Sequence, residues 1–105
     1  MDFLTRDPDI EVEFTFNGQK NRPVTDGYRP AHLINGNYLT TGLHRYYDVD
    51  EVMPCGTAKG TITFLTPEYY PHSISIGERI AIHEGATVVG FATVLKVMNP
   101  ILLKE

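Results

Sequence analysis

Cysteine, basic residues and long apolar runs are all scarce in this sequence of 105 residues. The single cysteine, Cys55, excludes a disulfide within the chain and fits a reducing compartment. No apolar run approaches the roughly 20 residues that a membrane-spanning helix requires. The first ten residues, MDFLTRDPDI, lack the basic region and the apolar stretch of a secretory signal. We therefore expect a cytoplasmic protein that does not associate with a membrane.

Basic residues number 9 against 13 acidic ones, which gives a formal net charge of −4. The acids cluster in residues 7–13 and 48–51, whereas Lys and Arg are scattered along the chain. Since nucleic-acid affinity depends mainly on neutralising phosphates with Lys and Arg, this balance disfavours a stand-alone nucleic-acid binder. A small local contact remains compatible with it, and the acidic clusters are interpreted first as solvated surface.

Groups that carry out catalysis or bind metals are equally sparse. No catalytic-cysteine signature surrounds Cys55, so we predict an inert thiol. The four histidines, His32, His44, His72 and His83, lie too far apart in sequence to match a compact metal-ligand motif. We therefore expect no catalytic residue, no metal and no cofactor, and we classify the chain as a non-enzyme.

The apolar residues alternate as in β-strands and do not follow helical spacing. Within residues 10–16, Ile10, Val12, Phe14 and Phe16 alternate with polar residues, which predicts a half-buried strand. No window keeps helical apolar spacing over three turns, and seven prolines and nine glycines interrupt the chain. Further extended segments are expected at residues 27–34, 38–47, 57–66 and within 78–97. Regular turn signals between these segments indicate one all-β domain, a small barrel or sandwich.

Residues 78–97, ERIAIHEGATVVGFATVLKV, predict two strands joined at Glu84 and Gly85, because glycine permits a turn with positive φ. Gly90 lies inside the second strand, where a missing side chain indicates a bulge, a bend or the close approach of another backbone. The apolar residues expected to serve the fold of this hairpin are Ile80, Ile82, Val89, Phe91, Leu95 and Val97.

Three motifs occur in a fixed order along the chain: GYRP at 27–30, MPCG at 53–56 and ERIAIHEGATVVG at 78–90. In this order they make residues 9–98 resemble the third, C-terminal domain of elongation factor Tu. Residues 1–8 are then an N-terminal arm and residues 99–105 a short tail. The resemblance implies a single six-stranded antiparallel Greek-key barrel. It also implies a non-catalytic docking domain that contacts the GTPase domain, aminoacyl-tRNA and the nucleotide exchange factor.

The departures from the family pattern concern the binding surface. The chain has no phosphate-binding GxxxxGK[ST] loop, so GTP binding in the family's manner is not expected. The closing turn at 84–88 lacks the arginine that the family offers there, and His83 stands where a second arginine is usual. Ala31 and His32 replace a glutamine and an aromatic residue. We therefore predict docking to a protein of the translation machinery, with tRNA disfavoured by the net charge and the lost arginines. The alternative is a small acidic protein of the immunity type that uses the barrel to block a toxin.

Several polar and aromatic residues are candidates for contact with a partner. Arg29 in GYRP offers a planar fork for a carboxylate or phosphate, although an internal ion pair or stacking contact is the favoured explanation. The tyrosine pairs at 46–47 and 69–70 suit a protein interface, or one ring of each pair caps the barrel. The apolar residues of the tail, 101–103, cover a barrel edge or dock on a second copy. The predicted partner-binding residues are Tyr28, Arg29, His32, Tyr46, Tyr47, His83, Glu84, Gly85 and Thr87.

Overall fold

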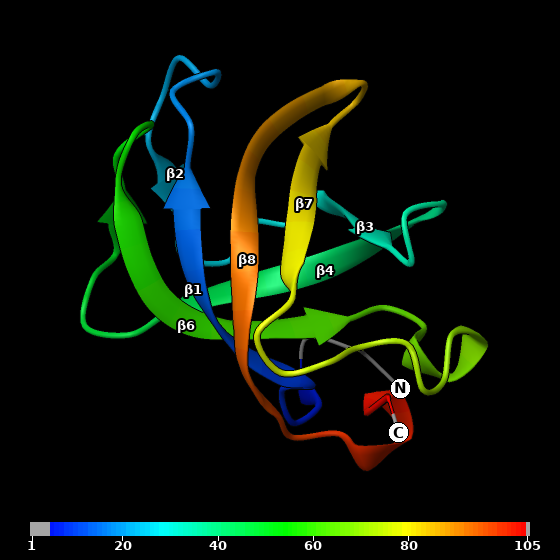
Figure 1. Ribbon diagram of the computed structural model, residues 1–105. Coiled ribbons are helices and arrows are strands. Elements are labelled where there is room, and N and C mark those ends of the chain that lie inside the picture. Colours follow the sequence, from blue (N-terminus) through cyan, green and yellow to red (C-terminus); the bar gives the residue numbers. More distant parts are fainter. Residues whose placement is uncertain (1–4, 105) are drawn as a thin grey trace.

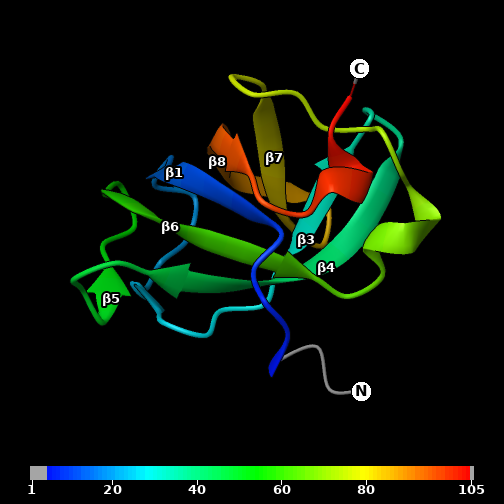
Figure 2. The same ribbon diagram turned by 90° about the horizontal axis from the view of Figure 1, so that it is seen from below.

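The computed structural model describes residues 5–104 and shows a closed β-barrel (Figures 1 and 2). Its strands are β1 (Ile10–Phe16), β3 (Ala31–Ile34), β4 (Tyr38–Tyr46), β6 (Thr57–Phe64), β7 (Arg79–Glu84) and β8 (Thr87–Val97). They close in the order β1-β6-β4-β3-β7-β8, and every neighbouring pair is antiparallel. The prediction of an all-β chain with a six-stranded antiparallel barrel is confirmed.

Short elements complete the described part of the chain. A two-stranded sheet forms from β2 (Val24–Thr25) and β5 (Glu51–Val52), and two 3-10 helices, η2 (Pro67–Tyr69) and η3 (Pro100–Leu102), follow β6 and β8. Within residues 5–104 no helix is long and apolar enough to cross a membrane.

Strand β1 has the inside-outside alternation that its sequence predicts. Ile10, Val12, Phe14 and Phe16 are buried in the barrel, and they join the core with apolar residues of β6, β7 and β8. The polar residues between them face outward, because successive side chains of a strand point to opposite faces of the sheet. Burial of these apolar side chains supplies the main favourable term for closing the barrel.

Strand β8 departs from simple alternation, and the expectation that Leu95 serves the fold as Val89 does is wrong. Val89 has no partner on β7, and Leu95 has none on β1, so the pairing register shifts at both positions. Each extra residue reverses which side chains face the core. Ala92 and Val94 are buried as a result, whereas Phe91 lies half-buried on the outside and Leu95 is exposed.

Gly90 is the site of a close approach between backbones, one of the three possibilities that its position in a strand indicates. A Cβ atom added there would lie 2.6 Å from the carbonyl oxygen of Thr15 and 3.0 Å from Cα of Phe16. Any side chain would therefore push β8 away from β1.

The predicted strand at residues 27–34 is shorter in the structure and begins at Ala31. Residues 27–30 still run along β4, since Gly27 N–H donates to the His44 carbonyl and the Tyr28 carbonyl accepts from His44 N–H. Pro30 has no N–H to donate, which interrupts the ladder before β3. This irregular approach places Tyr28 outside the regular sheet.

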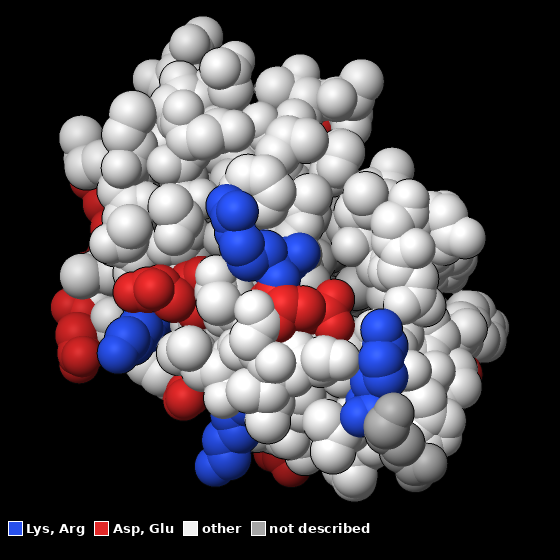
Figure 3. Space-filling model, in the orientation of Figure 1, with Lys and Arg blue, Asp and Glu red and all other residues white. Residues whose placement is uncertain are grey.

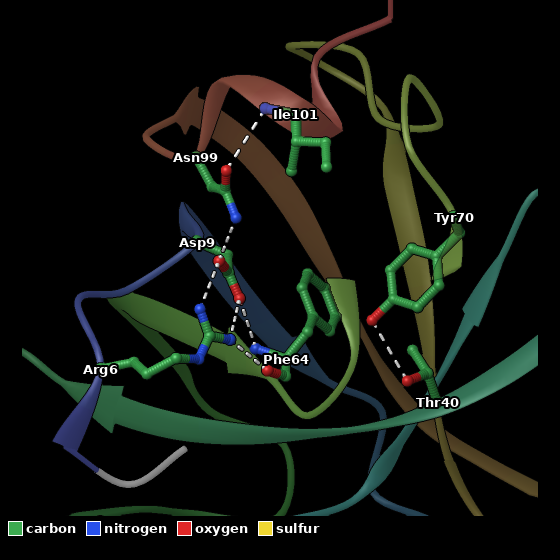
Figure 4. A network of polar contacts seen from close by, with 7 residues as sticks. All are labelled: Arg6, Asp9, Thr40, Phe64, Tyr70, Asn99 and Ile101. Atoms are coloured by element: carbon green, nitrogen blue, oxygen red, sulfur yellow. Dashed lines mark hydrogen bonds and ion pairs between the residues drawn. The ribbon is translucent and has the colours of Figure 1, made fainter. Parts of the chain in front are cut away.

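Both ends of the chain close one end of the barrel through the buried carboxylate of Asp9 (Figure 4). Its oxygens accept hydrogen bonds from Arg6, from the Phe64 N–H at 2.7 Å and from Asn99 Nδ2 at 2.9 Å. Arg6 also donates to the Phe64 carbonyl oxygen at 2.5 Å. Part of the predicted arm, residues 5–8, is thereby held against the barrel, while residues 1–4 lie outside the described residues.

The tail covers one end of the closed barrel, whereas the first of its two predicted roles was to cover a strand edge. Leu102 in η3 is fully buried in the core, and residues 74 and 103 form an isolated parallel bridge. Asn99 caps η3 by accepting a hydrogen bond from Ile101 N–H. Ile101 and Leu103 stay partly exposed on either side of Leu102.

Candidate functional site: a polar pocket at one barrel end

A polar pocket opens between the connection that follows β1 and the β7–β8 turn, which lie at the same end of the barrel (Figure 1). Its volume is about 310 Å³. The residues that line it are Gln19, Lys20, Asn21, Arg22, Glu84, Thr87 and Val89. The pocket thus combines an ammonium, a guanidinium, a carboxylate, amides and a hydroxyl group.

The connection is fixed at its base by Asn17 and Gly18, which follow β1 directly. Asn17 N–H donates to the Val89 carbonyl at 3.0 Å, and its Nδ2 donates to the Val88 carbonyl at 2.9 Å. Gly18 adopts a φ of 84° and donates to the Pro54 carbonyl at 2.8 Å. An Asn-Gly pair suits this turn because glycine reaches positive φ without strain. The basic side chains that follow are therefore presented from an anchored loop.

Glu84 is the centre of the polar contacts in the pocket. Lys20 Nζ lies 2.7 Å from Glu84 Oε2, and the Tyr28 hydroxyl donates to the same oxygen. The Lys20 ammonium also lies 5.3 Å from the centre of the Tyr28 ring, within cation–π range. Hydrogen bonds from Lys20 and then from Tyr28 lower the pKa of Glu84, so the side chain is a carboxylate at neutral pH.

Tyr28 is kept neutral by the same arrangement. Burial, followed by its hydrogen bond to Glu84, raises the pKa of the Tyr28 hydroxyl. The phenol consequently stays a donor and holds the Glu84 carboxylate in one orientation. Lys20 and Tyr28 lie between β1 and β3, Glu84 ends β7, and the three side chains form one preorganised unit.

Arg22 differs from Lys20 because its charge is not used within the described chain. Its side chain is exposed and lines the pocket, and it makes no hydrogen bond or ion pair with residues 5–104. A guanidinium presents a planar set of N–H donors that matches a carboxylate in a bidentate manner. Arg22 is thus the group in this pocket best placed to bind an incoming acidic group.

The structure brings together three of the residues predicted from sequence, Tyr28, Glu84 and Thr87, with Gly85 in the adjoining turn at a φ of 59°. Arg29 is exposed next to Tyr28 in the chain but does not line the pocket. Lys20 and Arg22 were not predicted. The only sequence signal for them is their charge in a turn-rich connection, and nothing in the sequence pairs residue 20 with residue 84.

Two predicted contact residues are inside the barrel, and these assignments are wrong. His32 is fully buried and Tyr46 is 7% exposed, because both side chains point to the core face of their strands. Neither can touch a partner on the surface of the closed barrel. His83 is mostly covered, and both of its ring nitrogens are buried without a hydrogen bond.

The tyrosine pairs follow the second of the two interpretations, with one ring buried and one exposed in each pair. Tyr46 and Tyr70 are buried, whereas Tyr47 is 43% and Tyr69 72% exposed. The Tyr47 hydroxyl donates to Glu11 at 2.8 Å and does not line the pocket. Tyr47 therefore remains a surface residue separate from the candidate site.

A second hollow of about 490 Å³ lies between residues 5–9 and residues 98–100. Its main polar groups, Arg6 and Asp9, already bond to each other and to the barrel (Figure 4). They hold the chain ends in place, so we assign this hollow no ligand. Elsewhere in the described chain, no group of three or more His, Cys, Asp or Glu side chains is arranged to hold a metal ion.

The chain matches no model of a known protein family.

Proposed function

We propose that this protein is a non-catalytic binding module that docks a protein partner at the polar pocket of residues 19–22, 84 and 87. The observation that supports it most is the convergence of Lys20, Tyr28 and Glu84 beside Arg22. Side chains that already hold each other lose little conformational entropy when a partner arrives. The pocket therefore suits recognition by position and charge.

The chemistry of the pocket favours an acidic side chain on the partner. The Arg22 guanidinium offers two parallel N–H donors, and a carboxylate is the group on a protein that matches them. Glu84 adjoins this site with its charge balanced by Lys20, which reduces its repulsion of an incoming acid. The partner would place a carboxylate on Arg22 and bury the rim of the pocket around it.

The resemblance to the third domain of elongation factor Tu makes a component of the translation machinery the first partner class to test. The net charge of −4 and the mixture of charges on the surface favour a protein over tRNA. On the face shown in Figure 3, basic and acidic side chains lie beside one another and form no continuous basic area.

A second candidate function uses the acidic surface of the same barrel. Asp48 and Asp50 are exposed on the connection between β4 and β5, and Glu51 is exposed at the start of β5, at a distance in sequence from the pocket residues. A basic toxin could be blocked there by complementary charge, as in an immunity protein. This alternative predicts a different set of sensitive residues.

Affinity capture from lysate with matched charge variants tests both proposals. We expect Arg22→Glu to abolish recovery of the specific partner, because a glutamate carboxylate replaces the guanidinium and repels the partner's own carboxylate. Lys59→Glu, at an exposed position of β6, makes the same change in net charge and should leave recovery within about twofold. Retention of the partner by Arg22→Glu would contradict docking at the pocket.

Two further measurements separate the partner classes. Replacement of Asp48 and Asp50 by Asn and of Glu51 by Gln should abolish recovery only if the acidic surface binds a toxin. A gel-shift titration against aminoacyl-tRNA at low salt should show no complex, and a salt-sensitive shift would instead identify tRNA as the ligand.

A further inference from the structure

Two histidines, His32 on β3 and His44 on β4, form a hydrogen-bonded chain inside the barrel. Both side chains are fully buried, and their Nε2 atoms lie 2.7 Å apart. His32 Nδ1 lies 3.3 Å from the Thr40 carbonyl oxygen, and His44 Nδ1 lies 3.0 Å from the Tyr46 hydroxyl. All four ring nitrogens therefore have one partner each.

These contacts fix the tautomers of both rings. A carbonyl oxygen only accepts, so His32 carries its proton on Nδ1 and leaves a lone pair on Nε2. His44 must then donate from Nε2 to that lone pair, and its own Nδ1 accepts from the Tyr46 hydroxyl. The chain runs in one direction and satisfies every ring nitrogen only while both imidazoles are neutral.

Neither ring of the pair is bonded to a carboxylate of residues 5–104 that would balance a positive charge. Phe14 of β1 lies 4.3 Å from His44 and Phe64 of β6 lies 5.7 Å from His32, measured between ring centres. The titratable groups that face the pair are Tyr28, Tyr46 and, from β7, His83, with Tyr70 behind Thr40. Three acids bond to residues next to the pair and not to the rings themselves. Glu84 bonds to the Tyr28 hydroxyl, Asp26 to the Tyr46 N–H and Asp9 to the Phe64 N–H.

An added proton has no suitable position in this arrangement. On His32 Nε2 it would point at the N–H of His44 across 2.7 Å, which replaces an attraction by a repulsion. On His44 Nδ1 it would require the Tyr46 hydroxyl to reverse and would leave a buried charge without a counter-ion. Burial accordingly lowers the pKa of His32 to about 4, and burial followed by the proximity of His32 lowers that of His44.

His32 also lies at the shortest seam of the barrel. Strands β3 and β7 pair at only two positions, Ala31 with His83 and His32 with Ile82, fewer than at any other seam. Separation of these two strands costs fewer backbone hydrogen bonds than separation of any other neighbouring pair. It is also the route by which the His32 ring can reach water.

We propose that the His32–His44 pair is a proton-sensitive latch: buried and neutral, it permits the barrel to close at neutral pH, and its protonation in mild acid opens the barrel at its shortest seam, β3–β7. A proton on His32 Nε2 breaks the Nε2–Nε2 contact, and a proton on His44 Nδ1 leaves a charge buried without a counter-ion. In either case hydration of the charged ring draws β3 away from β7. The other five seams, including the β3–β4 seam that the pair spans, have longer ladders and stay closed in the same pH range.

The direction of the pH dependence follows from the protonation states. In the opened or unfolded chain each histidine titrates near pH 6.5, whereas in the closed barrel His32 takes up a proton only near pH 4. The open state therefore binds more protons below pH 6.5, and closure is fully favoured above that value and weakens as pH falls toward 4. For His32 alone the opening equilibrium rises about 20-fold between pH 7 and pH 5.

Amide hydrogen exchange followed by NMR on the intact chain tests the latch. After correction for the intrinsic pH dependence of exchange, the amides of β3 and β7 that bond across their shared seam should lose about 20-fold protection between pH 7 and pH 5. Amides of β1 and β6 should keep theirs. Loss of protection by all strands together would show global unfolding and would overturn the opening of one seam.

Variants and imidazole spectra complete the test. Replacing both His32 and His44 by Gln removes the two imidazoles of the pair and leaves His83 in place, while an amide can still donate and accept, so the extra exchange in acid should vanish. His72→Gln, at an exposed position, should leave the extra exchange in acid unchanged.

If the double variant does not fold, ¹⁵N imidazole spectra of the wild type decide: both rings must stay neutral well below the pH at which an exposed histidine titrates. Titration of His32 or His44 near pH 6.5 would overturn the proposal.

Discussion

Single residues decide how the interior of this barrel is filled, and Gly42 is the clearest case. It is buried on β4 opposite Phe64, and a Cβ atom there would lie 2.7 Å from Cγ2 of Ile62 and 2.8 Å from Cε1 of His32. The absent side chain thus provides the space that the His32 ring occupies. Neither the sequence position of Gly42 nor that of His32 indicates this relation.

Gly42→Ala is expected to destabilise the protein by about 1–3 kcal/mol, because the added methyl group overpacks a site with no free volume. Gly36→Ala is the comparison, since nothing lies within 4 Å of its Cβ position and its φ of 74° imposes only backbone strain, about 1–2 kcal/mol. Urea unfolding at pH 7 measures both. In the Gly42 variant, a loss of stability together with a disturbed His32 imidazole spectrum is expected, whereas an unchanged spectrum would contradict the packing argument.

Among the elements, β8 and η3 show that a regular apolar pattern does not by itself predict which side chains are buried. The two unpaired residues of β8, Val89 and Leu95, shift which side chains face inward, so that Val94 is buried and Leu95 is exposed. In η3, one turn of helix directs Leu102 into the core and leaves Ile101 partly in solvent. In both elements neighbouring apolar residues have opposite environments.

Leu102→Ala should cost about 2–5 kcal/mol, because it removes a fully buried side chain and leaves a cavity at the barrel end. Ile101→Ala removes a similar volume from a position that is 39% exposed and should cost about 1 kcal/mol or less. Thermal or urea unfolding of the two variants provides the measurement. Equal losses would mean that the tail does not close the barrel as described.

At the scale of the whole molecule, one buried carboxylate connects the two ends of the chain to the middle. Asp9 binds Arg6 before β1, the backbone of Phe64 at the end of β6, and Asn99 after β8. Its own carbonyl oxygen also accepts from the N–H groups of residues 98 and 99. The network holds three strand ends at one point, so its loss affects the closure of the entire barrel (Figure 4).

Asp9→Asn is expected to destabilise the protein by about 3 kcal/mol, because it removes the charge opposite Arg6 and places an amide donor among other donors. Asp7→Asn changes the same chemical group at an exposed position two residues away and should change stability by less than about 0.5 kcal/mol. Urea unfolding curves at pH 7 compare them. A small effect of Asp9→Asn would show that its hydrogen bonds are replaced by water.

Local patterns predicted the elements better than they predicted the site. Alternation placed β1 at its observed bounds, and turn signals separated the remaining strands, because both depend on residues next to one another in sequence. The pocket depends on Lys20 meeting Glu84 across 64 positions of the chain, and on Arg22 being left without a partner among residues 5–104. Such a relation arises only when the barrel closes.

The buried residues His32 and Tyr46 also show that the sequence does not predict which polar side chains find partners inside the barrel. His32 follows the GYRP motif and Tyr46 belongs to a tyrosine pair, which made both of them surface candidates. In the folded chain both residues hydrogen-bond to His44 inside the barrel, His32 through its Nε2 atom and Tyr46 through its hydroxyl group. Burial of a polar side chain depends on such partners, and these are chosen by strand order and register.

The sequence by itself determined that this protein is one all-β domain, because period-2 alternation and frequent turn residues are local properties of the chain. Only the tertiary structure decided which strands are neighbours, which face of β8 points inward, and which charged groups meet at the barrel end. It also decided that His32 and His44 share one hydrogen bond in the core. The physical reason is that register and closure place residues distant in sequence within a few ångströms, and the energies of polar contacts depend on those distances.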